Sequence, residues 1–176
     1  MKGFMKRLLF ILLLPSALYS QTVHIEDDRI VYKGTVNVPG VNKEELSARA
    51  GDAIRNNVKG KKEDFIEDKE TGRLTAKGKM RLTTPWHLIR TVDYILELSV
   101  EDGKYKYRVD SVNWKQVERG GKTIKLSSAE LFKGIEATGS ESIEAEKQLN
   151  EIDMKFQKLI ALIHNEMKKG PVVKTP

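Results

Sequence analysis

The dipeptide Asp102-Gly103 stands between two stretches in which apolar and polar residues alternate. This combination predicts a β-hairpin with a two-residue loop of type I′, in which both central residues need positive φ. Such a loop also sets the register, because positions equally distant from the turn face each other. We therefore expect three apolar pairs on one side of the hairpin: Val100 with Tyr105, Leu98 with Tyr107, and Leu96 with Val109.

The other side of this hairpin is polar, with Glu97 facing Arg108. Further along the second strand the apolar residues shift from odd to even positions, which indicates a β-bulge near Asp110 and Ser111. Alternation of the same kind predicts further strands at three places, residues 29–38, 63–67 and 73–82. Strands with a single apolar side are typical of an antiparallel sheet that is covered on one face only.

Capping residues mark the helices. Asn42 and Glu45 have the spacing of a capping box and predict a helix from Lys43 to about Val58. Ser127 and Glu130 have the same spacing and predict a short helix that ends at Gly134, after a loose hairpin or loop over residues 115–125. Apolar residues at helical spacing predict a long final helix over about 141–169.

These elements predict an α+β fold. We expect a curved antiparallel sheet of about five strands with helices packed on one face, in the order strand, helix, four strands, long C-terminal helix. The chain has 176 residues and no cysteine, which excludes disulfides and any site built on thiolates. With no internal repeat and no long linker, residues 21–169 form a single expected domain, followed by a tail over residues 170–176.

The first 20 residues have the pattern of a secretory signal peptide. Three cations, Lys2, Lys6 and Arg7, precede an apolar run over residues 8–14, which is too short to span a membrane. We expect cleavage between Ser20 and Gln21, no transmembrane segment in the mature form, and a periplasmic or secreted protein. The whole chain carries a net charge of +6, and without the three leader cations it carries +3, which is too little to indicate nucleic-acid binding.

Several short segments resemble a bacterial secreted domain of unknown function that has a TATA-binding-protein-like fold. The resemblance covers about residues 28–114 and rests on six segments: Arg29-Ile-Val-Tyr32, Val38-Pro-Gly-Val41, Asn42-Lys-Glu-Glu-Leu46, Arg49-Ala50, the strand over 72–78, and Val100-Glu-Asp-Gly-Lys-Tyr105. These motifs are structural and not chemical. The resemblance implies the fold, and the fold name carries no DNA binding with it.

No motif of the chain indicates catalysis, a metal or a cofactor. The three histidines, His24, His87 and His164, have no ligand spacing, and no nucleophile elbow or glycine-rich phosphate loop is present. Paired acids such as Asp27-Asp28 are more typical of solvated turns than of a glycosidase site. We therefore expect a protein that is not an enzyme.

Three features remain as candidates for binding. Lys77, Lys79 and Arg81 share the polar side of one predicted strand, where they would attract an anionic ligand or serve as an ordinary solvated face. Trp86 and His87 lie in a loop next to Pro85, where the tryptophan would either contact a ligand or close the core.

Leu162 lies beyond the apolar seam of the final helix. We expect it to widen the core contact, with an apolar edge for a partner as the alternative.

Taken together, these observations favour a non-catalytic envelope module that binds a protein or an envelope ligand. A hydrolase of cell-wall or glycan substrates is one alternative, and a structural or assembly accessory in an envelope oligomer is another. The sequence names neither the ligand nor the oligomeric state.

Overall fold

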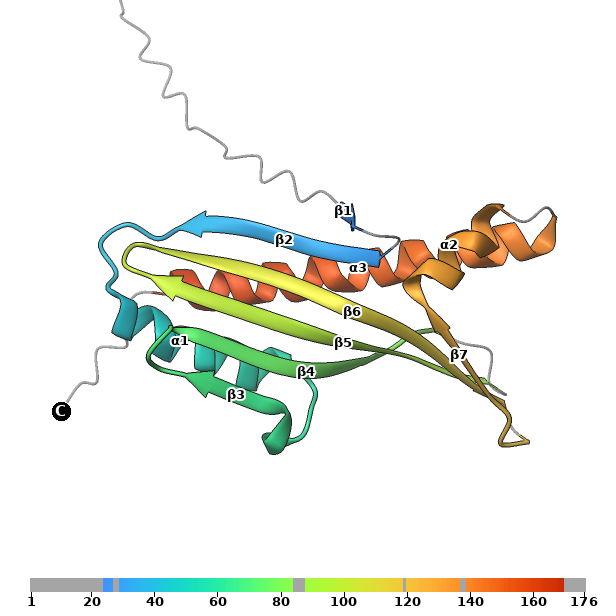
Figure 1. The fold of residues 1–176 in the computed structure, drawn as a ribbon, viewed down its shortest axis with the longest axis horizontal. Coiled ribbons are helices and arrows are strands. Elements are labelled where there is room, and N and C mark those ends of the chain that lie inside the picture. The colour runs from blue at the N-terminus through green and yellow to red at the C-terminus, as the bar shows by residue number, and fades with distance from the viewer. Residues whose placement is uncertain (1–23, 27–28, 84–87, 119, 137–138, 170–176) are drawn as a thin grey trace, which may run out of the picture.

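The computed structural model describes residues 24–26, 29–83, 88–118, 120–136 and 139–169 (Figure 1). They form one antiparallel sheet of seven strands in the order β1-β2-β6-β5-β4-β3, with β7 also pairing with β6. The strands are β1 His24–Glu26, β2 Arg29–Asn37, β3 Phe65–Asp68, β4 Arg73–Arg81, β5 Leu88–Glu101, β6 Lys104–Glu118 and β7 Thr123–Ser127. The helices are α1 Lys43–Asn57, the short 3-10 helix η1 Lys62–Asp64, α2 Ser128–Glu136 and α3 Ser140–Lys168. The predicted α+β architecture is confirmed.

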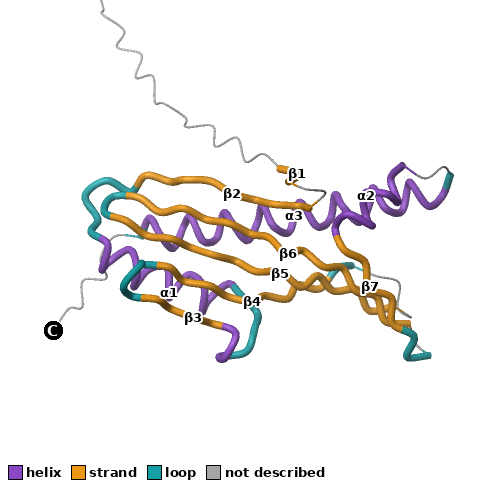
Figure 2. The backbone as a smooth tube through the Cα atoms, viewed as in Figure 1, coloured by secondary structure: helices purple, strands orange, loops and turns teal. Residues whose placement is uncertain are grey.

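Two layers result, because α1 and α3 both pack on the same face of the sheet (Figure 1). The strands β5 and β6 run the length of the sheet (Figure 2). The first half of β6 pairs with β2 and its second half pairs with β7, while β5 occupies the other side of β6. The sheet therefore has more strands than the expected five, and the segment predicted as a loose hairpin or loop contributes β7.

The hairpin register is confirmed, with Leu98 opposite Tyr107 and the neighbouring apolar pairs in place. The turn type is not as predicted, because Gly103 has φ +70° while Asp102 has no positive φ. Asp102 serves a different purpose. Its carboxylate accepts the backbone N–H of Lys43 at 2.8 Å, and the N–H of Gly103 donates to the carbonyl of Val41 at 2.9 Å. The turn is thus tied to the start of α1.

The predicted bulge is confirmed in β6. The register shifts so that Tyr94 of β5 lies opposite both Ser111 and Val112. Ser111 has φ +52° and is the only residue other than glycine with positive φ in the described part of the chain. A bulge increases the local twist and redirects side chains.

Helix α1 begins as predicted, with the Asn42 side chain accepting the N–H of Glu45 at 2.9 Å. Helix α2 also has its predicted cap, since the Glu130 N–H donates to the Ser127 hydroxyl at 3.3 Å. Gly134, however, lies within α2 and does not end it. A Cβ at Gly134 would stand 3.2 Å from the Cβ of Ala145 in α3, so this glycine allows the two helices to approach closely.

Helix α3 spans the sheet and buries Phe156 completely. The Phe156 ring packs against Tyr32 of β2 at 4.9 Å and edge-on against Tyr94 of β5 at 5.1 Å between centroids. Leu162 of the same helix is 40% exposed, so the expectation that it widens the core is wrong. No helix in the described ranges is long and apolar enough to cross a membrane.

Candidate functional site

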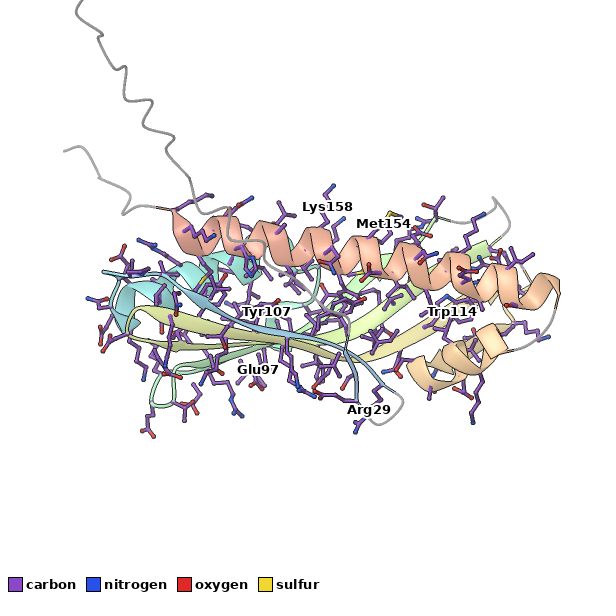
Figure 3. The ribbon with its side chains drawn as sticks, turned by 90° about the horizontal axis from the view of Figure 1, so that it is seen from above. Arg29, Glu97, Tyr107, Trp114, Met154 and Lys158 are labelled. Carbon is purple, nitrogen blue, oxygen red and sulfur yellow. The ribbon has the colours of Figure 1, made fainter. Side chains whose placement is uncertain are left out.

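The two faces of the sheet differ in what covers them. Alternation places residues such as Leu96 and Leu98 under the helices, where both are fully buried. Glu97, between them in sequence, lies on the side of the sheet opposite α3 (Figure 3). Neither α1 nor α3 lies on this second side, the open face, which presents mostly charged and polar side chains.

One half of the open face is neutralised by its own ion pairs. A hollow of about 610 Å³ near the β2–β6 pairing is lined by four cations, and each has a carboxylate partner. The pairs are Lys33 with Glu26, Arg73 with Glu97, Lys106 with Glu101, and Arg108 with Glu26 and Asp110. Hydrogen bonds from Lys104 and Lys106 lower the pKa of the Glu101 carboxyl to about 2. This half therefore carries little uncompensated charge at neutral pH.

The other half contains a larger hollow of about 820 Å³ at the bulge, which we call the basic groove. Five cations and two carboxylates line it: Lys59, Lys61, Lys77, Lys79 and Arg81, with Asp64 and Asp93. Ile89, Ile95, the bulge residue Ser111 and Asn113 also line it. The three basic residues singled out from the sequence, Lys77, Lys79 and Arg81, are thus brought together in one groove.

A backbone contact brings Lys59 and Lys61 to this groove. The N–H of Lys79 donates to the carbonyl of Lys59 at 2.9 Å, so the segment after α1 runs beside β4. A Cβ on Gly60 would stand 2.5 Å from the carbonyl oxygen of Lys77, a distance that backbone atoms do not tolerate. Only glycine allows this approach. The lysines on either side of it are held next to Lys77, Lys79 and Arg81 of β4, which we call the β4 row.

Most of the positive charge in the basic groove is unpaired. Lys79 pairs with Asp93 at 3.5 Å and Lys61 with Glu63 at 3.3 Å, and all four side chains are exposed. Within the described ranges, Lys59, Lys77 and Arg81 form no ion pair. Exposed pairs of this kind are weak and exchange readily with other charges. The groove is therefore a region of uncompensated positive potential.

The basic groove also has apolar parts. Ile89 is 48% exposed. Ile95 lies directly opposite Lys77 in the β4–β5 register. Tyr94 is the only aromatic residue among the described groove-lining residues, and it is buried, with 3% exposure. The groove thus offers cations and aliphatic side chains and no exposed ring.

The remaining candidates are distributed over other parts of the chain. Trp86 and His87 lie outside the described residues, as do Ser20 and Gln21 at the expected cleavage site. Leu162 belongs to α3, the helix that packs on the other face of the sheet. Sequence reasoning missed Lys59 and Lys61 because their position depends on where their segment passes β4, and the only local signal was the glycine between them.

The described residues contain no group of three His, Asp or Glu side chains that could hold a metal ion. His164 is 8% exposed and packs edge-on against Tyr105 at 5.9 Å and Tyr107 at 5.3 Å. Burial lowers the pKa of this histidine to about 4, with a smaller contribution from Lys168. His164 is therefore a neutral core residue near pH 7.

Comparison with known proteins connects this geometry to a family. Residues 32–115 match the family model of DUF4468, a domain of unknown function with a TBP-like fold. The family resemblance drawn from the sequence is confirmed. The DUF4468 match includes all of α1, β3, β4 and β5, the part of β2 from Tyr32 onward, and most of β6 with the bulge. It contains every residue that lines the basic groove.

Two solved structures share the fold. A DUF4468 family protein from Bacteroides ovatus ATCC 8483 superposes with a TM-score of 0.61 at 13% identity, covering 88% of this chain and 94% of that one. A TBP-like protein from Parabacteroides distasonis ATCC 8503 superposes with a TM-score of 0.59 at 11% identity, covering 81% and 97%. At these identities the likeness shows the fold alone. No curated protein matches this chain.

Proposed function

We propose that this protein is a non-catalytic binding module of the bacterial envelope that holds its ligand in the basic groove of the open face. One observation carries the proposal. Helices α1 and α3 cover one face of the sheet, while the other face holds a groove whose cations Lys59, Lys77 and Arg81 have no ion-pair partner in the described chain. An uncompensated charged groove on a rigid sheet favours binding of an oppositely charged ligand.

The envelope location is part of the same proposal and rests on the leader pattern of residues 1–20. Mass spectrometry of the protein from the envelope fraction tests it. A mature chain that begins at Gln21 is expected, and a chain with Met1 intact would contradict export with cleavage.

Site-directed photocrosslinking in cells tests the binding surface. A photoreactive amino acid at Thr91, which lines the basic groove, is compared with one at Lys158 on the outer side of α3 (Figure 3). Crosslinked products from Thr91 and not from Lys158 are expected. Products from Lys158 alone would contradict the proposal.

A second candidate is an assembly accessory, favoured by exposed apolar side chains on α3. Ile143 is 70% exposed and Met154 is 64% exposed, and both line a hollow of about 630 Å³ on this helix. The molecular mass in solution distinguishes this role from that of a binding module. An assembly accessory should form an oligomer, and Met154→Lys should weaken it.

A further inference from the structure

We propose that the basic groove binds an extended acidic segment of a partner protein in which every second residue is Asp or Glu. This inference rests on the proposed function of the groove as a binding surface. It adds the chemical class of the ligand and the two-residue spacing of its acidic side chains.

The spacing of the cations is the first argument. Lys77, Lys79 and Arg81 are alternate residues of β4, and all three line the same groove. A strand rises about 3.4 Å per residue, so neighbouring cations are about 7 Å apart along the strand. An extended peptide has the same rise, and carboxylates on alternate residues repeat at the same distance. A row of such acids therefore matches the β4 row one to one.

The availability of the charges is the second argument. Lys77 and Arg81, at the two ends of the row, have no ion-pair partner among the described residues. Lys79, in the middle, has only the exposed pair with Asp93 at 3.5 Å. An incoming carboxylate replaces this pair at little cost, since pairs in full solvent are weak. Lys59 and Lys61 add positive potential along the side of the row.

The groove's other residues favour a peptide over a single-stranded nucleic acid. Single-stranded nucleic acids stack their bases on exposed aromatic rings. The only aromatic among the described lining residues is Tyr94, which is buried under the sheet. The groove also contains two aliphatic residues, Ile95 opposite Lys77 and Ile89 beyond the β4 row. They can contact apolar side chains of the peptide on either side of its acidic stretch. Acidic peptide motifs are a known class of ligand for clusters of cations.

Fluorescence anisotropy with the mature full-length protein tests the inference. The probes are a labelled peptide of about ten residues that alternates Asp and Ser, and a peptide of the same composition with its aspartates in one block. We expect the alternating peptide to bind about fivefold more tightly, and Lys77→Gln with Arg81→Gln to weaken it about tenfold. Lys106→Gln, in the neutralised half of the open face, is the matched control and should leave binding unchanged.

Three results would overturn the inference. Equal binding of the two peptides would show that the groove does not recognise the repeat. Tighter binding of oligothymidylate or of a sulfated polysaccharide would assign the groove to another class of polyanion. Failure of both peptides to bind would remove the acidic segment as ligand, while crosslinks from Thr91 in cells would still support the groove as a binding surface. The absence of those crosslinks would instead remove the proposed function itself.

Discussion

Gly78 of β4 lies directly opposite Tyr94 of β5, and the tyrosine ring occupies the space that a side chain on the glycine would need. A Cβ on Gly78 would stand 2.2 Å from Cζ of Tyr94. The same ring packs edge-on against Phe156 of α3 at 5.1 Å. Because Gly78 has no side chain, the Tyr94 ring has room to lie over β4 and to connect the sheet to α3.

Replacing this glycine should destabilise the protein. Gly78→Ala places a methyl group against the Tyr94 ring and forces the ring away from Phe156. We expect a loss of about 1 to 3 kcal/mol in the free energy of unfolding, measured by urea denaturation. Gly120→Ala is the control, because a Cβ there meets nothing within 4 Å. Equal stability of the two variants would contradict the packing described for Tyr94.

The two faces of the β5–β6 hairpin should respond differently to the same new charge. Leu98→Lys buries an ammonium at a position that is 0% exposed, and we expect a loss of several kcal/mol, on the order of 4, in the free energy of unfolding. Glu97→Lys breaks the partly exposed pair with Arg73 at 3.4 Å and places a solvated ammonium opposite Arg108, so it should cost only about 1 kcal/mol. Similar falls in melting temperature for both would mean that the faces are wrongly assigned.

Stability should fall in mild acid because of His164. Burial against Tyr105 and Tyr107 lowers its pKa in the folded protein to about 4, whereas a solvated histidine side chain has a pKa of 6.5. Between these values the unfolded chain binds a proton that the folded chain does not, so stability falls as the pH drops from about 6.5 to 4. We expect this group to contribute a loss of about 2 kcal/mol at pH 4.5 relative to pH 7.

Urea denaturation of wild type and His164→Gln at both pH values isolates this contribution from that of the carboxyl groups. The variant should lose about 2 kcal/mol less than wild type over the same range. The same pH dependence in both proteins would contradict the assignment to His164.

The outer side of α3 should tolerate a charge at Leu162. The leucine is 40% exposed, and Leu162→Glu should change the free energy of unfolding by less than about 0.5 kcal/mol. Ile160→Glu, two residues earlier and 1% exposed, should cost several kcal/mol, on the order of 4, because it buries an unpaired carboxylate. A large fall in melting temperature for Leu162→Glu would place this leucine in the core after all.

The features that could be predicted from the sequence are those determined within a few residues of the chain. The Asp102-Gly103 loop and its matched flanks specify the hairpin register, and the shift of apolar phase specifies the bulge at Ser111. The backbone of Asp102 could not be predicted in the same way. Its carboxylate accepts the N–H of Lys43, which is distant in sequence, and Asp102 has no positive φ as a type I′ turn would require.

The features that could not be predicted depend on where distant segments meet. Gly134 is indistinguishable in sequence from a helix terminator, and only the approach of Ala145 shows why it lies inside α2. The composition of the basic groove also depends on the meeting of distant segments. Its β4 row is visible in the sequence as alternating cations, whereas Lys59 and Lys61 join it through the contact of Gly60 with β4.

The most direct test of the central claim combines the crosslinking position with the groove charges. The yield of crosslinked product from a photoreactive residue at Thr91 is measured in cells, in the wild-type chain and with Lys77→Gln and Arg81→Gln together. If the basic groove holds the ligand through these cations, the product forms in the wild type and falls about tenfold in the double variant, while Lys106→Gln leaves it unchanged. The same yield in all three proteins would contradict the account.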